Sequence, residues 1–170
     1  MSYHTDLLEQ AEHLARRERK RPRQASLRRS VSASYYALFH LLVDEAVGRM
    51  FRGNDRAALR DCMARAFSHR DMFAVARQFA SGGISAKLLP SLNGLSPQPE
   101  LIVVAEAFCD LQQARHEADY NRAGRFTRRQ ALGLQQRARH AFSEWRKVRT
   151  SLQADAFLAA LLAYGSLRGG

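Results

Sequence analysis

The stretch that decides the fold is SASYYALFHLLV, residues 32–43. From residue 35 to residue 43 the side chains are apolar on nearly every side, which favours a helix contacted from several directions. Apolar and small residues at helical spacing form one face that runs through this stretch and beyond it in both directions: Leu27, Val31, Ser34, Tyr35, Leu38, Leu42 and Ala46. The pattern therefore predicts a central helix from about residue 23 to residue 50.

The chain before this helix predicts a first, amphipathic helix. Its apolar stripe is Leu7, Leu8, Ala11 and Leu14. We expect it to begin near Thr5, with Thr5 or Asp6 as N-cap, and to be ended or broken by Pro22.

The chain after the central helix predicts only further helices, since no alternating strand pattern is present. A helical region should follow the RGND turn at residues 52–55, with Asn54 or Asp55 as cap and Ser68 capping a second piece. Six glycines and prolines between residues 81 and 99 predict one long loop. Further helices are expected after Pro99 as far as RHEADYN (residues 115–121), from Thr127 to about residue 148, and in DAFLAALLAYG (residues 155–165), which belongs to the core or to an association surface.

These elements predict an all-α, up-and-down bundle of four to five main helices plus a C-terminal helix. We expect a single domain over residues 1–170, with its core at about 5–150, the long loop at 81–99 and a C-terminal helical extension at 151–170.

No apolar run approaches the roughly 20 residues of a membrane span. The polar start, MSYHTDLLEQ, is neither a signal nor a transit peptide. Cys62 and Cys109 form no CxxC pair, so we expect a cytoplasmic chain in which both thiols are buried.

The strongest global signal is the net charge of +11. It favours a polyanionic partner, most simply nucleic acid. Only three of the 27 cations are lysines, and arginine suits phosphate because its guanidinium is a flat, bidentate fork. Arginine-rich codon usage is the alternative explanation of this ratio.

Two basic stretches are candidates for phosphate contacts. Residues 16–29, RRERKRPRQASLRR, hold eight cations against one Glu, Arg28 and Arg29 among them. They suit either phosphate binding or a solvated helix end. Residues 128–149 combine a core face with cations opposite to it, which favours a solvated surface.

Polar residues of chemical interest recur at helical spacing. Tyr36 and His40 share a helix face, which allows the phenol and the imidazole to contact each other in a functional site. The alternative interpretation is that both side chains belong to the core. Within RHEADYN, Arg115 and Asp119 are placed to pair, as are His116 and Tyr120. Neither a phosphate-binding Gly-rich loop nor metal-ligand spacing around His69 and Arg70 is present. We therefore expect no metal and no cofactor.

Three of these pieces together resemble a known family. SASYYALFH at residues 32–40, His69 with Arg70, and Arg115 with Ala118, Asp119 and Tyr120 are similar to the pattern of HEPN domains, especially small stand-alone bacterial and archaeal ones. The resemblance covers about residues 5–150. It implies a HEPN-like helical bundle that forms a homodimer, often encoded beside a nucleotidyltransferase partner in toxin–antitoxin or defence modules.

The resemblance also implies a chemistry, and here the chain departs from the family. Many HEPN proteins are metal-independent RNases whose signature is Arg, four to six residues, then His. The corresponding positions hold Tyr120, Asn121 and Arg122. Arginine can stabilise phosphorane charge but cannot act as a base, and a tyrosine near pKa 10 is poorly matched to that task.

Three hypotheses follow. The first is binding of RNA or nucleotide phosphates in a basic cleft, with Arg115 as the clamp, Asp119 as its orienter and Tyr120 as a stacking or hydrogen-bonding group. The other residues expected around this cleft are Tyr36, His40, Asn121, Arg122, Arg28 and Arg29. The second is an endoribonuclease in which His116, His40 or Tyr120 replaces the missing histidine. The third is a non-catalytic protein-interaction module.

Overall fold

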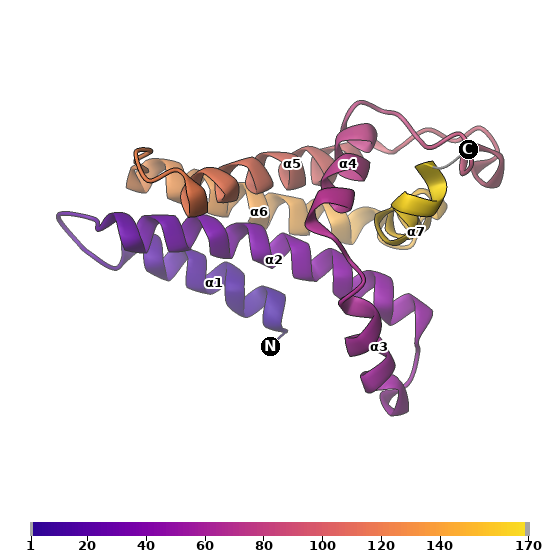
Figure 1. The fold of residues 1–170 in the computed structure, drawn as a ribbon, viewed down its shortest axis with the longest axis horizontal. Helices are drawn as coiled ribbons and strands as arrows, with labels where there is room; N and C mark the ends of the chain where they lie inside the picture. The colour runs from indigo at the N-terminus through magenta and orange to yellow at the C-terminus, as the bar shows by residue number, and fades with distance from the viewer. Residues whose placement is uncertain (1, 169–170) are drawn as a thin grey trace. The chain divides into compact units, whose positions relative to one another are not determined.

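The computed structural model describes residues 2–168, and this part of the chain is helical with no strand (Figure 1). The predicted all-α class is confirmed. In chain order the elements are α1 (Tyr3–Arg16), α2 (Gln24–Met50), the 3₁₀ helix η1 (Asn54–Arg56), α3 (Ala57–Ala64), α4 (His69–Ala80), the 3₁₀ helix η2 (Leu89–Leu92), α5 (Pro99–Tyr120), α6 (Arg128–Val148) and α7 (Leu152–Arg168). Residues 169–170 of the expected C-terminal extension lie outside the described residues.

The chain divides into two compact units, each made of two separate segments of the sequence. The first unit combines residues up to 40 with residues 107–143, and the second combines residues 41–106 with residues from 144 onward. The first unit therefore contains α1, the beginning of α2, the end of α5 and the beginning of α6.

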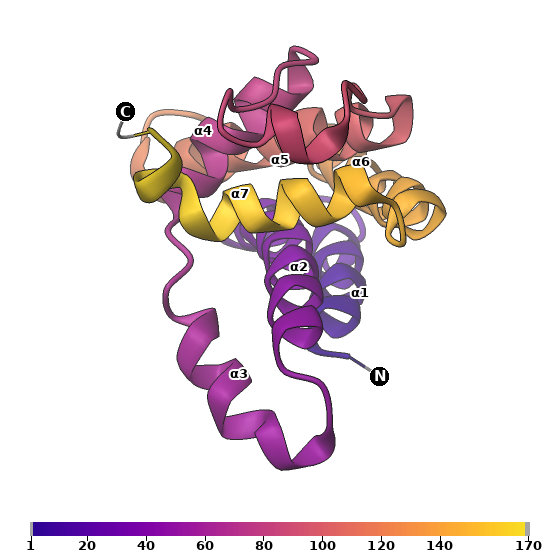
Figure 2. The same ribbon diagram turned by 90° about the vertical axis from the view of Figure 1, so that its right-hand side faces the viewer.

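The core of the first unit combines small, aliphatic and aromatic residues. Its central cluster joins all four helices through Ala15, Leu27, Val31, Ala118 and Ala131. Ser30 Oγ donates a hydrogen bond of 2.6 Å to the carbonyl oxygen of Ala11, so α1 lies close against α2. The two helices run side by side in both views (Figures 1 and 2). Tyr35 on α2 is fully buried against Phe108 on α5, with ring centroids 5.5 Å apart.

The second unit is built around α4 and α7. Phe79 and Phe157 join these two helices, with ring centroids 4.9 Å apart. Arg49 pairs with Glu45 and Asp155 and lies 5.8 Å above the ring of the buried Trp145. In contrast, no residue of α3 (Ala57–Ala64) is buried.

Two predicted helix starts are wrong and one is confirmed. α1 begins at Tyr3 after Ser2, not near Thr5 or Asp6, because the amides of Thr5 and Asp6 already donate to the Ser2 carbonyl. α3 is preceded by a 3₁₀ turn, so Arg56 is its N-cap in place of Asn54 or Asp55. Ser68 does cap α4, accepting a hydrogen bond from the Asp71 amide.

The prediction that both thiols are buried is wrong. Cys62 is exposed and Cys109 is partly exposed. Cys62 belongs to α3, in which every side chain is at least partly exposed, so the position of Cys62 offers no burial. No helix in the described part combines the length and apolar character that a membrane span requires.

Candidate nucleic-acid interface

Two helices of the first unit bring the candidate residues together. Ser32 and Tyr36 are one turn apart on α2, and Arg115 and Asp119 are one turn apart on α5. Arg115 Nη2 donates to Tyr36 Oη at 3.1 Å, while Arg115 Nε lies 2.8 Å from Asp119 Oδ2. Ser32 Oγ donates to Asp119 Oδ1 at 2.6 Å. The pairing expected between Arg115 and Asp119 is thus present, and Ser32 extends it to α2.

Arg115 is largely buried but keeps its charge. Its side chain is 16% exposed, and the close contact of its Nε with Asp119 is an ion pair rather than an aligned hydrogen bond. Burial acts to lower the pKa of Arg115, but Tyr36 and Asp119 act to raise it, and the net shift is upward. A fixed cation therefore lies just beneath the surface.

Aromatic rings extend from this cation in two directions. Arg115 Cζ lies 5.5 Å from the Tyr36 ring centroid and 5.8 Å from that of Tyr120. Tyr36 stacks on His40 at 6.2 Å, and Tyr120 contacts His116 at 4.9 Å. The two pairs that helical spacing predicted are therefore in contact, each beside Arg115.

Two adjoining grooves lie along α2. The groove of about 640 Å³ between α1 and α2 is lined by Tyr3, Leu7, Gln10, Leu14, Arg17, Arg29, Ser32, Ala33, Tyr36 and His40. The groove of about 440 Å³ between α2 and α5 is lined by Ala25, Arg28, Arg29, Ser32, Tyr36, Ala118 and Asp119. Arg29, Ser32 and Tyr36 belong to both. Arg115 itself lines neither of these two grooves, but it contacts Tyr36 and Asp119, which do.

Arg28 lines the smaller groove and also has a structural role. Its guanidinium donates to the carbonyl oxygens of Ala118 at 2.7 Å and Asn121 at 2.9 Å, and also to that of Gly124. These carbonyls belong to the last turn of α5 and the segment after it, which have no partners within the helix. Arg28 thus fixes the end of α5 that carries Asp119 and Tyr120.

Other expected site residues lie at the margin. Asn121 shapes the turn after α5, where its Oδ1 accepts from the amides of Ala123 and Gly124. Arg122 is exposed just beyond it. Neither residue lines the two grooves among the described residues. His69 and Arg70 begin α4 in the second unit.

Sequence reasoning missed the contribution of α1. Tyr3, Leu7, Gln10, Leu14 and Arg17 all line the larger groove. They are spaced by four, three, four and three residues, which is the spacing of a single helix face. The signal was therefore in the sequence, but an exposed Tyr and Arg at its two ends do not resemble a core stripe.

The described residues contain no cluster of three or more His, Cys, Asp or Glu side chains able to hold a metal ion. Comparisons of the chain with protein-family models, curated proteins and solved structures give no match.

Proposed function

We propose that the chain is a HEPN-type protein that binds RNA or nucleotide phosphates at the surface formed by α1, α2 and the end of α5. One observation carries the proposal. Tyr36, Arg115 and Asp119, which come from two separate pieces of the sequence pattern, form one contact cluster. Tyr36 and Asp119 from this cluster line grooves that also hold Arg29.

The chemistry of the cluster suits a phosphate ligand. A guanidinium carries five N–H donors, and the aligned bond to Tyr36 uses one of them. Asp119 and Ser32 fix the position of the cation before a ligand arrives, which lowers the entropy lost on binding. Exposed Tyr120, 65% accessible, offers a ring on which a base can stack.

The test is retention of RNA by Arg115→Gln, with Arg115→Lys as the conservative variant. Arg129→Gln is the matched control, because it removes one exposed cation from the solvent face of α6. We expect the control to bind like the native protein and both Arg115 variants to bind more weakly, since lysine lacks the planar fork. Equal retention by all four proteins would exclude Arg115 from the site.

Metal-independent RNA cleavage is the second candidate. The observation that favours it is that His40 and His116 each contact a tyrosine that flanks Arg115. A general base must come within hydrogen-bond reach of the 2′-OH, and an imidazole has a suitable pKa for that role. Fragments formed in EDTA by the native protein and not by His40→Gln or His116→Gln would support cleavage. Retention without fragments would leave binding alone.

The homodimer and the nucleotidyltransferase partner stay predictions of the resemblance. The mass of the purified chain in solution tests the first, and co-purification with the product of an adjacent nucleotidyltransferase gene tests the second.

A further inference from the structure

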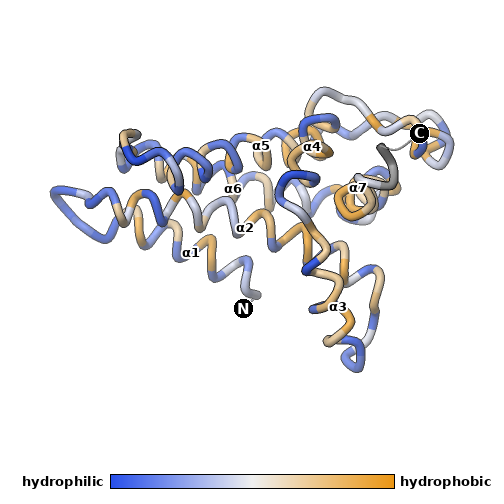
Figure 3. The backbone as a smooth tube through the Cα atoms, viewed as in Figure 1, coloured by the Kyte–Doolittle hydropathy of each residue, from blue (hydrophilic) through white to orange (hydrophobic). Residues whose placement is uncertain are grey.

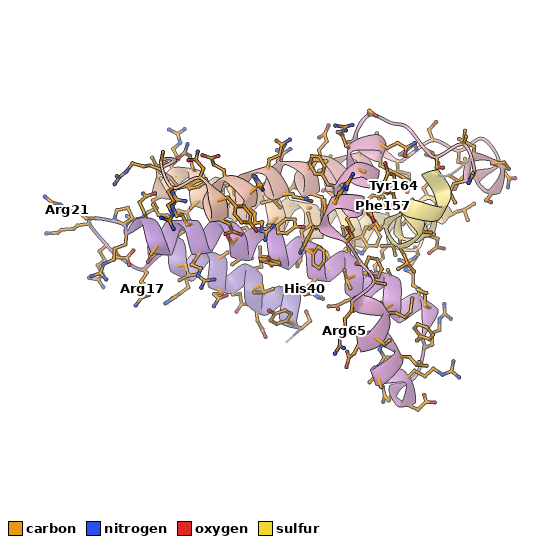
Figure 4. The ribbon with its side chains drawn as sticks, in the orientation of Figure 1. Arg17, Arg21, His40, Arg65, Phe157 and Tyr164 are labelled. Carbon is orange, nitrogen blue, oxygen red and sulfur yellow. The ribbon has the colours of Figure 1, made fainter. Side chains whose placement is uncertain are left out.

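The groove between α1 and α2 has two chemically different ends. Arg17 and Arg29 line one end, and Tyr3, Tyr36 and His40 line the other. Figure 4 shows Arg17 beside the connection between the two helices and His40 farther along α2. Figure 3 shows that the connection itself is hydrophilic. A ligand that fills the groove must therefore combine negative charge with flat, stackable groups.

The cationic end carries exposed positive charge. Both Arg17 and Arg29 are exposed, and within the described residues neither has a salt bridge. Glu18 is the nearby acid, and its carboxylate accepts from Ser26 Oγ at 2.7 Å and from the Arg23 amide at 3.2 Å. Its pKa is lowered mainly by the Ser26 hydrogen bond, with a smaller contribution from the charge of Arg17, which lies near it without forming a salt bridge. Two guanidinium groups thus remain available for phosphate oxygens.

The aromatic end is arranged as a platform. Tyr3 lies against His40 with ring centroids 4.9 Å apart, and His40 stacks on Tyr36. Tyr3 is nevertheless 60% exposed, so its ring does little to fill the core. An exposed ring braced by a second ring is suited to stacking on a base, and such stacking is largely independent of sequence.

The length of the groove excludes a single nucleotide as its full occupant. Arg29 and His40 are eleven residues apart on α2, which corresponds to roughly 16 Å along the helix axis. Stacked nucleotides advance about 3.4 Å each, so the groove accommodates several. Paired bases hide their faces within a duplex, whereas unpaired bases expose them to aromatic side chains.

We propose that the groove between α1 and α2 binds single-stranded RNA, with backbone phosphates on Arg17 and Arg29 and an unpaired base on the platform of Tyr3 and His40. This inference rests on the proposed function and names its substrate class. The ligand continues toward the groove beside Asp119, because the two grooves share Arg29, Ser32 and Tyr36.

The test measures fluorescence anisotropy of a labelled, unstructured twelve-nucleotide RNA. Competitors are the same RNA unlabelled, its duplex, and a mononucleotide. Arg17→Gln and Arg29→Gln probe the cationic end, with Arg21→Gln as the charge-matched control, since Arg21 is exposed in the same connection and lines neither groove among the described residues. Tyr3→Leu removes the stacking ring, and Tyr3→Phe keeps it.

We expect Tyr3→Leu to weaken binding by about 5-fold or more, as for loss of one base stack, and Tyr3→Phe to bind like the native protein. Arg17→Gln and Arg29→Gln should each bind more weakly than Arg21→Gln. Single-stranded RNA should compete better than its duplex or the mononucleotide.

Three outcomes overturn the inference. If native protein binds RNA and Arg115→Gln weakens it, but the groove variants match Arg21→Gln, the proposed function stands and this groove is not its site. The same holds if duplex and single strand compete equally. If the native protein binds no RNA at all, both proposals fail.

Discussion

Arg28 and Arg29 are adjacent in the sequence but have different surroundings in the fold. Arg28 lines only the smaller groove and donates to four backbone carbonyls in the last turn of α5 and the segment after it, whereas Arg29 lines both grooves and has no such bond among the described residues. We expect Arg28→Gln to lower the free energy of unfolding by about 1.5–3 kcal/mol, the range of hydrogen bonds that involve a charged group. Arg29→Gln should change it by less than about 0.5 kcal/mol, as at most surface positions. Urea denaturation of the two variants measures both values, and equal losses would contradict the separate roles.

Burial of the Tyr35 phenol predicts that the free energy of unfolding falls at alkaline pH. Burial raises its pKa above the ordinary value of 10.0, against a smaller lowering by Arg115. Since the folded pKa is above the unfolded one, the stability from neutral Tyr35 is complete below pH 10 and is lost as pH rises above it. The loss is at most about 1.4 kcal/mol per pH unit. In urea titrations between pH 9 and 11, Tyr35→Phe should show a shallower fall of stability than the native protein, and identical slopes would refute the assignment.

The sequence predicted site residues that lie within one helix turn of each other better than those brought together by packing. Helical spacing was sufficient for Arg115 with Asp119, because i and i+4 side chains share a face in any α-helix. It could not predict Ser32 as the second partner of Asp119, since that contact depends on how α2 lies against α5. The role of Arg28 was missed for the same reason.

The helices themselves followed from local signals wherever such signals were strong. The start of α2 after Pro22, the start of α5 at Pro99 and the cap of α4 at Ser68 agree with the sequence to within a residue. The end of α1 does not, because it stops at Arg16 rather than continuing to Pro22. The carbonyls of Ala15, Glu18 and Arg19, at and after the end of α1, accept hydrogen bonds from Arg128 at the start of α6. Arg128 is distant in the sequence, so local signals could not predict this contact.

Close contact between α1 and α2 depends on small residues, which gives a prediction for the pair of helices. Ala11 is fully buried and its carbonyl accepts from Ser30. A larger side chain has no space there, and overpacking typically costs about 1–3 kcal/mol. Ala11→Leu should therefore lower the midpoint of thermal unfolding, while His13→Leu, which places the same side chain at an exposed position of α1, should not. A midpoint for Ala11→Leu equal to that of the control would show that the helices are not closely packed at this point.

The net charge of the whole molecule and the position of individual arginines have separable effects on binding. A charge of +11 attracts any polyanion, whichever cations carry it. Several arginines are already engaged within the fold, and Arg28, Arg49 and Arg128 donate to backbone carbonyls. Their charge adds to the long-range field, but the donors that bind these carbonyls are already used within the protein. Charge alone therefore does not identify the contact residues.

Salt dependence separates these two effects. For single strands, the logarithm of the binding constant falls with the logarithm of salt concentration by about 0.7 for each neutralised phosphate. Replacing Arg17 and Arg29 together by Gln should reduce the steepness of this slope by about 1.4. Replacing Arg21 and Arg129 together by Gln removes the same two charges from the net charge of +11 and should leave the slope unchanged. Anisotropy titrations at four salt concentrations measure the slopes. If both double variants lose the same steepness, the RNA is held by the overall field of the protein, and the groove between α1 and α2 contributes no phosphate contacts of its own.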